Sequence, residues 1–143
     1  KNVLFIPPQP KEEMPRIWSL CNVALVHLRD HPAFANVIPS KMFEAMAMGL
    51  PIVLAVPDGE ARHILEADGA GLWVPPENPE ALAQAIKTLC SDIAQYETFA
   101  TASLASAPHH SREKQAQGMI DVFERACLGQ NQGQNQSQKQ DPS

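Results

Sequence analysis

Residues 37–60 read VIPSKMFEAMAMGLPIVLAVPDGE, and the order of signals in this stretch decides the fold. Apolar residues recur at helical spacing from Ser40 to Met48, and a glycine ends that pattern. The run from Pro51 to Val56 is continuously apolar, which is typical of a strand buried on both faces of a parallel sheet. The stretch therefore predicts a helix that leads directly into a buried strand.

Strand and helix signals continue to alternate on both sides of this stretch. A short helix is predicted at 59–68, and another begins at Asn78, Pro79 and Glu80, which supply an N-cap, a proline in the first turn and an acidic charge. The remaining helices are predicted at 11–21, 92–106 and 111–128, and the other strands at 2–6, 22–28 and 71–74. Strands separated by helices of this length predict an α/β, Rossmann-like fold with a parallel sheet of about four strands.

Composition predicts where the domain ends. Residues 130–143 read QNQGQNQSQKQDPS and contain no large apolar side chain. Such a segment cannot offset the entropy lost when a chain is ordered, so we expect residues 129–143 to form a disordered Gln/Asn-rich tail. The chain opens with KNVLFIPPQP, without a methionine, and enters a strand almost at once. We therefore expect the domain, residues 1–128, to be truncated at its N-terminus.

Composition also excludes several classes of function. The 143 residues carry a formal charge of −5 and no basic stripe, which argues against nucleic acid as a partner. No apolar run approaches the ~20 residues of a transmembrane segment, and no signal peptide is visible. The sequence contains no Asp-x-Asp and no His/Cys/Asp cluster with ligand spacing, so we expect neither a metal nor another cofactor.

The start of the helix at Ser40 combines groups that suit a nucleoside diphosphate. Ser40 is placed to cap the helix, where free N–H groups and the positive end of the dipole attract an anion. Lys41 adds a full charge, and Glu44 lies one turn further on the same face, where a carboxylate could accept ribose hydroxyl protons. Simple capping and compensation of the helix dipole account for the same residues equally well, so the residues alone leave both interpretations open.

The same segment resembles a known signature, Pro-Ser-Lys-x-x-Glu-x-Met-Ala-x-Gly-x-Pro. Its fixed positions are Pro39, Ser40, Lys41, Glu44, Met46, Ala47, Gly49 and Pro51. This pattern is similar to the C-terminal signature of family 4 glycosyltransferases, which have the GT-B fold, and most of all to their bacterial surface-polysaccharide branch. The resemblance extends to GAGLWVPPENPEALAQAI and FIPPQPKEEMPRIWSLCNVALVHL and covers nearly all of residues 1–128. It implies the C-terminal, donor-binding part of a GT-B domain.

The resemblance implies a retaining transferase. Its parent protein would move a sugar from a nucleotide diphosphate sugar to a lipid-linked or saccharide acceptor in polysaccharide synthesis, including that of lipopolysaccharide. An acceptor-binding N-terminal domain would lie upstream, so this chain alone is expected to be inactive. The protein is expected in the cytoplasm, or at the inner face of the membrane through the missing domain. The alternative is a non-catalytic nucleotide-sugar-binding module, whereas a GT-B epimerase would need a cluster of histidine and acidic residues that the sequence lacks.

The resemblance also assigns site residues. Glu44 matches the second glutamate of a Glu-x7-Glu motif, which holds the ribose hydroxyls of the donor. The first glutamate falls on Asn36, whose amide can bond a hydroxyl but carries no charge, so no catalytic residue is assigned. Ser40 and Lys41 match positions beside the nucleotide.

The loop before this helix supplies the remaining candidates. Backbone N–H groups of Asn36, Val37 and Ile38 are placed for the diphosphate or the donor sugar, and Pro39 ends the loop. His31 lies on the same loop and is a further candidate for contact with the donor sugar.

Overall fold

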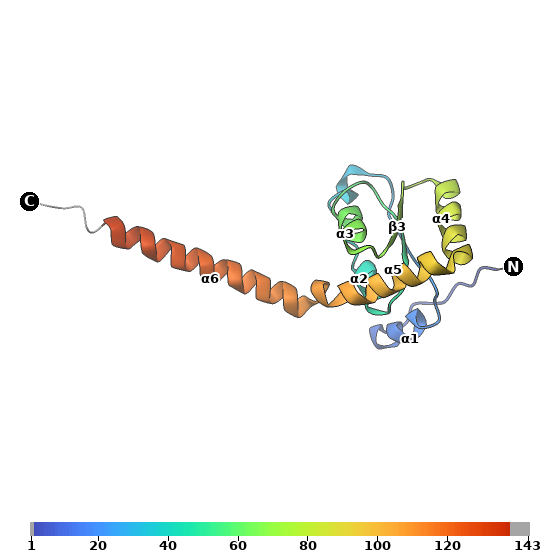
Figure 1. Cartoon of the computed structure of the whole chain (residues 1–143), viewed down its shortest axis with the longest axis horizontal. Coiled ribbons are helices and arrows are strands. Elements are labelled where there is room, and N and C mark those ends of the chain that lie inside the picture. The colour runs from blue at the N-terminus through green and yellow to red at the C-terminus, as the bar shows by residue number, and fades with distance from the viewer. Residues whose placement is uncertain (1, 138–143) are drawn as a thin grey trace, which may run out of the picture. The chain divides into compact units, whose positions relative to one another are not determined.

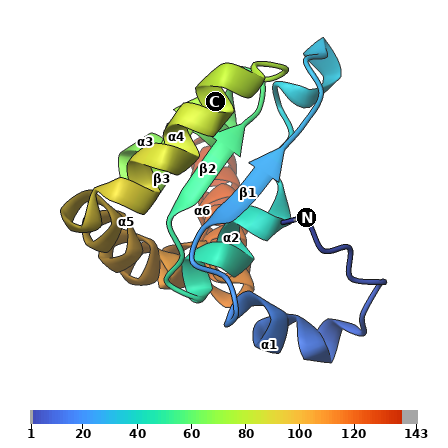
Figure 2. The same ribbon diagram turned by 90° about the vertical axis from the view of Figure 1, so that its right-hand side faces the viewer.

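The computed structural model describes residues 2–137 and divides into two units, residues 1–107 and 108–143. The first unit contains a three-stranded parallel sheet in the order β1-β2-β3. Its strands are β1 (Ala24–His27), β2 (Ile52–Ala55) and β3 (Gly71–Val74), drawn in Figures 1 and 2. The predicted α/β, Rossmann-like fold is therefore confirmed.

Helices connect the strands in the predicted order. The α-helices of the first unit are α1 (Met14–Trp18), α2 (Ser40–Ala47), α3 (Glu60–Asp68), α4 (Pro79–Ser91) and α5 (Ile93–Ser106). Short 3-10 turns lie at η1 (Lys11–Glu13), η2 (Pro32–Phe34) and η3 (Ala107–His110). Asn78 caps α4 as predicted, because its Oδ1 accepts a hydrogen bond from the Ala81 N–H at 2.9 Å.

The strand predicted at residues 2–6 is wrong. Residues 2–10 have no regular structure, and Val3, Leu4, Phe5 and Ile6 are all exposed. A strand needs a neighbour for its backbone hydrogen bonds, and none of the strands within residues 2–137 pairs with this segment. The helix predicted at 11–21 is also shorter, because its regular α-helical part is α1 alone.

Strand β2 is the centre of the core. All four of its residues are buried, so its continuous apolar run fits the two-sided burial that the sequence predicts. On one face, Ile52 and Leu54 belong to a cluster with residues of α2 and α3. On the other face, Val53 and Ala55 cluster with residues of α4. Figure 2 shows β1 and β2 side by side, with their arrowheads at the same edge of the sheet.

The register of the sheet places three loops at one edge. His27 of β1 pairs with Ala55 of β2, which pairs with Val74 of β3, so the three strands end level with one another. Residues 28–39, 56–59 and 75–78 leave from this carboxyl edge. In parallel sheets this is the edge at which ligands bind.

The opposite, amino-terminal edge is closed by α5. Ser103 is fully buried, and its hydroxyl lies 2.9 Å from the Leu50 carbonyl oxygen and 3.2 Å from the Ala70 carbonyl oxygen. Leu50 lies two residues before β2, and Ala70 immediately precedes β3. The Ala70 carbonyl already accepts the Ile52 N–H at 3.0 Å, so the nearer Leu50 carbonyl is the group that depends on the Ser103 hydroxyl.

In the second unit, helix α6 spans Arg112–Ser137. Its backbone is helical through 129–137, where the sequence analysis expects a disordered tail. Glutamine is a good helix former, and no proline interrupts the chain between Arg112 and Ser137. The rest of the predicted tail, residues 138–143, lies outside the described residues. No helix within residues 2–137 has both the length and the apolar character needed to cross a membrane.

We expect Ser103→Ala to lower the free energy of unfolding by about 1–3 kcal/mol, because the Leu50 carbonyl loses its buried hydroxyl donor. Urea denaturation measures this effect. Ser106→Ala is the matched control: Ser106 is also buried on α5, and its side chain has no hydrogen bond with any residue of 2–137, so its loss should cost clearly less. Equal effects of the two substitutions would contradict the role given to the Ser103 hydroxyl.

Candidate functional site

The N-cap of helix α2 is one residue earlier than the sequence predicts, at Pro39 and not at Ser40. Pro39 is the N-cap, with extended φ −69° and ψ 122°, and Ser40 is already the first helical residue. No side chain caps the helix, so the capping role predicted for Ser40 is wrong. A capping side chain must come from a non-helical residue, and proline occupies that position here. The first N–H groups of α2 are consequently left without a side-chain acceptor.

The predicted binding side chains share the exposed face of α2. Ser40, Lys41 and Glu44 are exposed, whereas Met42 and Met46 on the other face are buried against the sheet. Within residues 2–137, the Ser40 hydroxyl and the Lys41 ammonium make no hydrogen bond or ion pair. A hydroxyl, a cation and open helical N–H groups at one end of a helix suit an anion.

Glu44 has one polar contact in the structure. Its Oε2 accepts a hydrogen bond from Trp18 Nε1 of α1 at 3.4 Å. The carboxylate is exposed, and a carboxylate offers more acceptor positions than one indole N–H uses. Glu44 can therefore still accept hydrogen bonds from a ligand.

The loop between β1 and α2 places its candidate N–H groups differently from the prediction. The Val37 N–H donates to the Phe34 carbonyl at 3.1 Å, so this candidate donor already has an acceptor within the loop. The loop closes a turn there, which the sequence gives no reason to expect. The N–H groups of Asn36 and Ile38 make no hydrogen bond within residues 2–137, and the Asn36 side chain is exposed.

His31 has a structural role in the same loop. Its Nδ1 accepts a hydrogen bond from the Ala33 N–H at 3.1 Å and caps η2. Its ring also meets Phe34 edge-on, with ring centroids 6.0 Å apart. Through these two contacts the imidazole stabilises the loop to which it belongs.

Gly59 holds this loop against the turn between β2 and α3. A Cβ atom at Gly59 would lie far inside van der Waals contact with the carbonyl oxygen of Ala35, so only glycine allows the two backbones to approach. Ala35 immediately precedes Asn36. The position of the candidate N–H groups therefore depends on a residue in a different loop.

A cluster around Arg62 supports the β2-α3 turn. Arg62 contacts Glu66 at 2.8 Å and Asp58 at 3.4 Å, and its guanidinium lies 4.0 Å from the centroid of the Trp73 ring. The hydrogen bond to Glu66 is the main cause that raises the pKa of Arg62 above its ordinary value. Trp73 Nε1 in turn donates to the Val56 carbonyl at 2.9 Å. These contacts fix the turn that carries Gly59 to α3 and β3.

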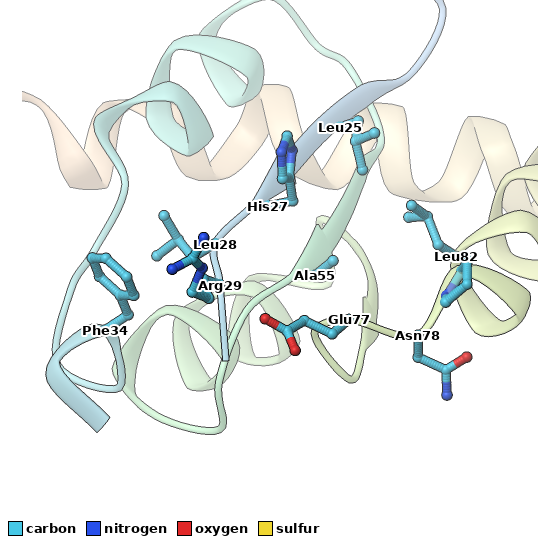
Figure 3. A pocket seen from close by; sticks show the side chains of 10 residues that line it. Leu25, His27, Leu28, Arg29, Phe34, Ala55, Glu77, Asn78 and Leu82 are labelled. Atoms are coloured by element: carbon cyan, nitrogen blue, oxygen red, sulfur yellow. The ribbon is translucent and has the colours of Figure 1, made fainter. Parts of the chain in front are cut away.

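A pocket that the sequence analysis does not predict opens at the carboxyl edge on the α4 side of the sheet (Figure 3). Its volume is about 840 Å³. It is lined by Leu25, His27, Leu28, Arg29, Phe34, Ala55, Glu77, Asn78, Pro79 and Leu82. None of the predicted nucleotide-binding residues, 36–41 and 44, lines it.

The polar groups of this pocket come from two loops. Glu77 has a positive φ of 56°, uncommon for a residue other than glycine, and its Oε1 accepts a hydrogen bond from the Asp30 N–H at 3.3 Å. Arg29 makes no ion pair or hydrogen bond with any other residue of 2–137. The cap residue Asn78 is visible in the sequence, but nothing there marks Glu77, because a glutamate is not the residue expected at positive φ.

Metal ligands do not gather in the described part of the chain. Within residues 2–137, no three His, Cys, Asp or Glu side chains come close enough together to hold a metal ion.

Comparison with known proteins identifies the family. The family described as "Glycosyl transferases group 1" matches residues 1–104, which include the whole sheet and α2. The chain belongs to the glycosyl transferases group 1 family. Its α/β fold is that of a GT-B glycosyltransferase domain.

Three proteins are similar to this group 1 glycosyltransferase chain. A probable glycosyltransferase, WbjE of Pseudomonas aeruginosa, is 38% identical over 71 residues, covering 49% of this chain and 18% of that protein. A D-inositol 3-phosphate glycosyltransferase of Rhodococcus opacus (strain B4) is 24% identical over 136 residues, covering 95% of this chain and 29% of that protein. The solved structure of a sucrose-phosphate synthase from Thermosynechococcus elongatus matches with a TM-score of 0.72 and 24% identity over 88% of this chain.

This group 1 glycosyltransferase chain spans less than a third of each relative, with 18%, 29% and 30% of their lengths covered. The similarity to the synthase, at 24% identity, concerns the fold.

We expect Gly59→Ala to lower the free energy of unfolding of this chain by about 1–3 kcal/mol, because the added methyl group pushes the Ala35 backbone away. Urea denaturation measures this effect. Gly118→Ala on α6 is the control, since its Cβ meets nothing within 4 Å and alanine favours a helix. A Gly59→Ala variant as stable as the wild type would show that the two backbones can separate freely.

Proposed function

We propose that this chain is the donor-binding part of a glycosyltransferase that transfers a sugar from a nucleotide diphosphate sugar to a lipid-linked or saccharide acceptor. The reaction retains the anomeric configuration and serves bacterial surface-polysaccharide synthesis, as the resemblance of the Pro39–Pro51 signature implies. The protein binds its donor in the cytoplasm, or at the inner face of the membrane when the acceptor is lipid-linked. Membership of the group 1 family supports the general reaction.

The observation that carries this proposal is the exposed face of α2. Its open N–H groups, the Ser40 hydroxyl and the Lys41 ammonium lie at the start of the helix, and Glu44 follows one turn later. The positive groups suit a diphosphate and the carboxylate suits the hydroxyls of a ribose. A nucleoside diphosphate contains both chemical groups.

The same groups suggest how the reaction is assisted. When the bond between the sugar and the diphosphate breaks, negative charge grows on the departing phosphate oxygen. The dipole of α2 is fixed by the fold before the reaction starts and would stabilise that charge without reorganising, and Lys41 would add a full positive charge at the same end of the helix. The N–H groups of Asn36 and Ile38 would add two donors from the neighbouring loop. No metal is required in this scheme.

Asn36 favours a second candidate function, a non-catalytic nucleotide-sugar-binding module. An amide stands where the family signature has a glutamate, so the charge that glutamate would bring to the donor sugar is missing. The binding groups on α2 are unaffected by this difference. The two candidates therefore share the donor site and differ in turnover.

Thermal unfolding of the purified protein with a panel of nucleoside diphosphates and their sugars tests the proposal. A ligand that binds the native state raises the unfolding temperature, because it stabilises that state by RT ln(1 + L/Kd), where L is the free ligand concentration. We expect a concentration-dependent rise with the diphosphate of one base. If no member of the panel changes the unfolding temperature, the proposed donor site is wrong.

We expect Glu44→Ala to weaken binding of that nucleotide by about 1–3 kcal/mol, because hydrogen bonds to a charged acceptor are lost. Isothermal titration calorimetry gives the affinity. Glu97→Ala on α5 is the control, since Glu97 is equally exposed and has no side-chain partner within residues 2–137. The ribose assignment fails if Glu44→Ala binds as tightly as Glu97→Ala.

If Asn36 stands in place of a glutamate whose charge assists catalysis, we expect Asn36→Glu to raise the rate of sugar transfer. The assay follows release of the nucleoside diphosphate from the donor identified above by the full-length protein, with Asn36→Gln as a control that lengthens the side chain without adding charge. A rise with glutamate alone would support the transferase, whereas no turnover in either variant would favour the binding module.

A further inference from the structure

Trp18 connects α1 to the exposed face of α2. Its indole Nε1 lies 3.4 Å from Glu44 Oε2, although the two residues are 26 positions apart in the sequence. The Trp18 ring is half-buried and packs against the hydrophobic core, whereas Glu44 is exposed. The place of the indole N–H is therefore set by core packing, and Glu44 is the partner that adapts.

The backbone around Trp18 is held as well as its ring. The Ser19 N–H donates to the Pro15 carbonyl at 3.0 Å, and the Cys21 N–H donates to the Trp18 carbonyl at 3.0 Å. The Cys21 thiol also lies 3.6 Å from the Ile17 carbonyl oxygen. These bonds close the turn that joins α1 to β1, so the backbone that carries the indole is held in place.

We propose that Trp18 is a positioning residue for nucleotide binding: its indole N–H holds Glu44 Oε2 and leaves Oε1 to accept a ribose hydroxyl. The inference rests on the proposed function, because it takes Glu44 as the ribose-binding residue. An exposed glutamate loses rotamer freedom when a ligand fixes it, and a donor that orders the carboxylate beforehand reduces this loss.

The length of the hydrogen bond sets the size of the effect. A separation of 3.4 Å is at the long end for an N–H donor, so the bond is weak and orients the carboxylate more than it stabilises the fold. A purely structural link between α1 and α2 would change stability and leave the selectivity for ribose unchanged. If Trp18 is a positioning residue, loss of its indole N–H changes that selectivity.

The test compares nucleotides that differ by one hydroxyl. The ribonucleoside diphosphate that binds best among ADP, GDP, UDP and CDP is titrated by calorimetry, followed by its 2′-deoxy and 3′-deoxy analogues. In the wild type we expect one analogue to bind at least about tenfold more weakly, because it lacks the ribose hydroxyl that donates to the Glu44 carboxylate. In Trp18→Phe, which keeps a packed ring and removes the N–H, we expect this ratio to fall below about threefold. In a Glu44→Ala background, Trp18→Phe should change the ratio no further.

Trp73→Phe is the matched control, because it removes an indole N–H that donates to the Val56 carbonyl and does not contact Glu44. Its ratio should equal that of the wild type. A Trp18→Phe variant with the wild-type ratio would overturn the positioning role while Glu44→Ala still loses affinity and the proposed function stands. If no nucleotide binds, or if Glu44→Ala binds all of them as the wild type does, the ribose assignment fails and the inference fails with it.

Discussion

The parallel pairing of β2 with both of its neighbours is the constraint on which the rest of the molecule depends. Because the three strands run in one direction and end level, α2 and α3 must each return across a face of the sheet before the next strand begins. The loops that precede the helices then gather at the carboxyl edge. The burial of all four β2 residues follows from this, since helices cover the sheet from both sides.

The candidate site is built from the same constraint. Helix α2 must bury Met42 and Met46 against the sheet, so Ser40, Lys41 and Glu44 face outward. The loop ahead of α2 is held by Gly59 from the next connection along the edge, and Glu44 meets Trp18 from the helix before β1. Two segments that are distant in sequence thus support one short helix and the loop before it.

Periodicity made the fold predictable, and contact between distant segments made much of the site unpredictable. The apolar run at 51–56 and the spacing at 40–48 predicted β2 and α2, and the spacing also placed Glu44 one turn after Ser40 on the same face of the helix. The strand at 2–6 was predicted wrongly because local composition does not reveal whether a pairing partner is present. The bond between Val37 and Phe34 and the positive φ of Glu77 depend on how loops close, and no residue type in the sequence marks them.

The approach of Gly59 to Ala35 divides the loop after β1 into two parts with different freedom to evolve. Residues 28–34 connect the strand to the contact, and insertions there could be accommodated by a longer path over the surface. Residues 36–39 are the short span between the contact and the first turn of α2. Insertions or deletions in that span would shift the helix start relative to the sheet. Related chains should therefore vary in length before the position of Ala35 and keep a constant number of residues after it.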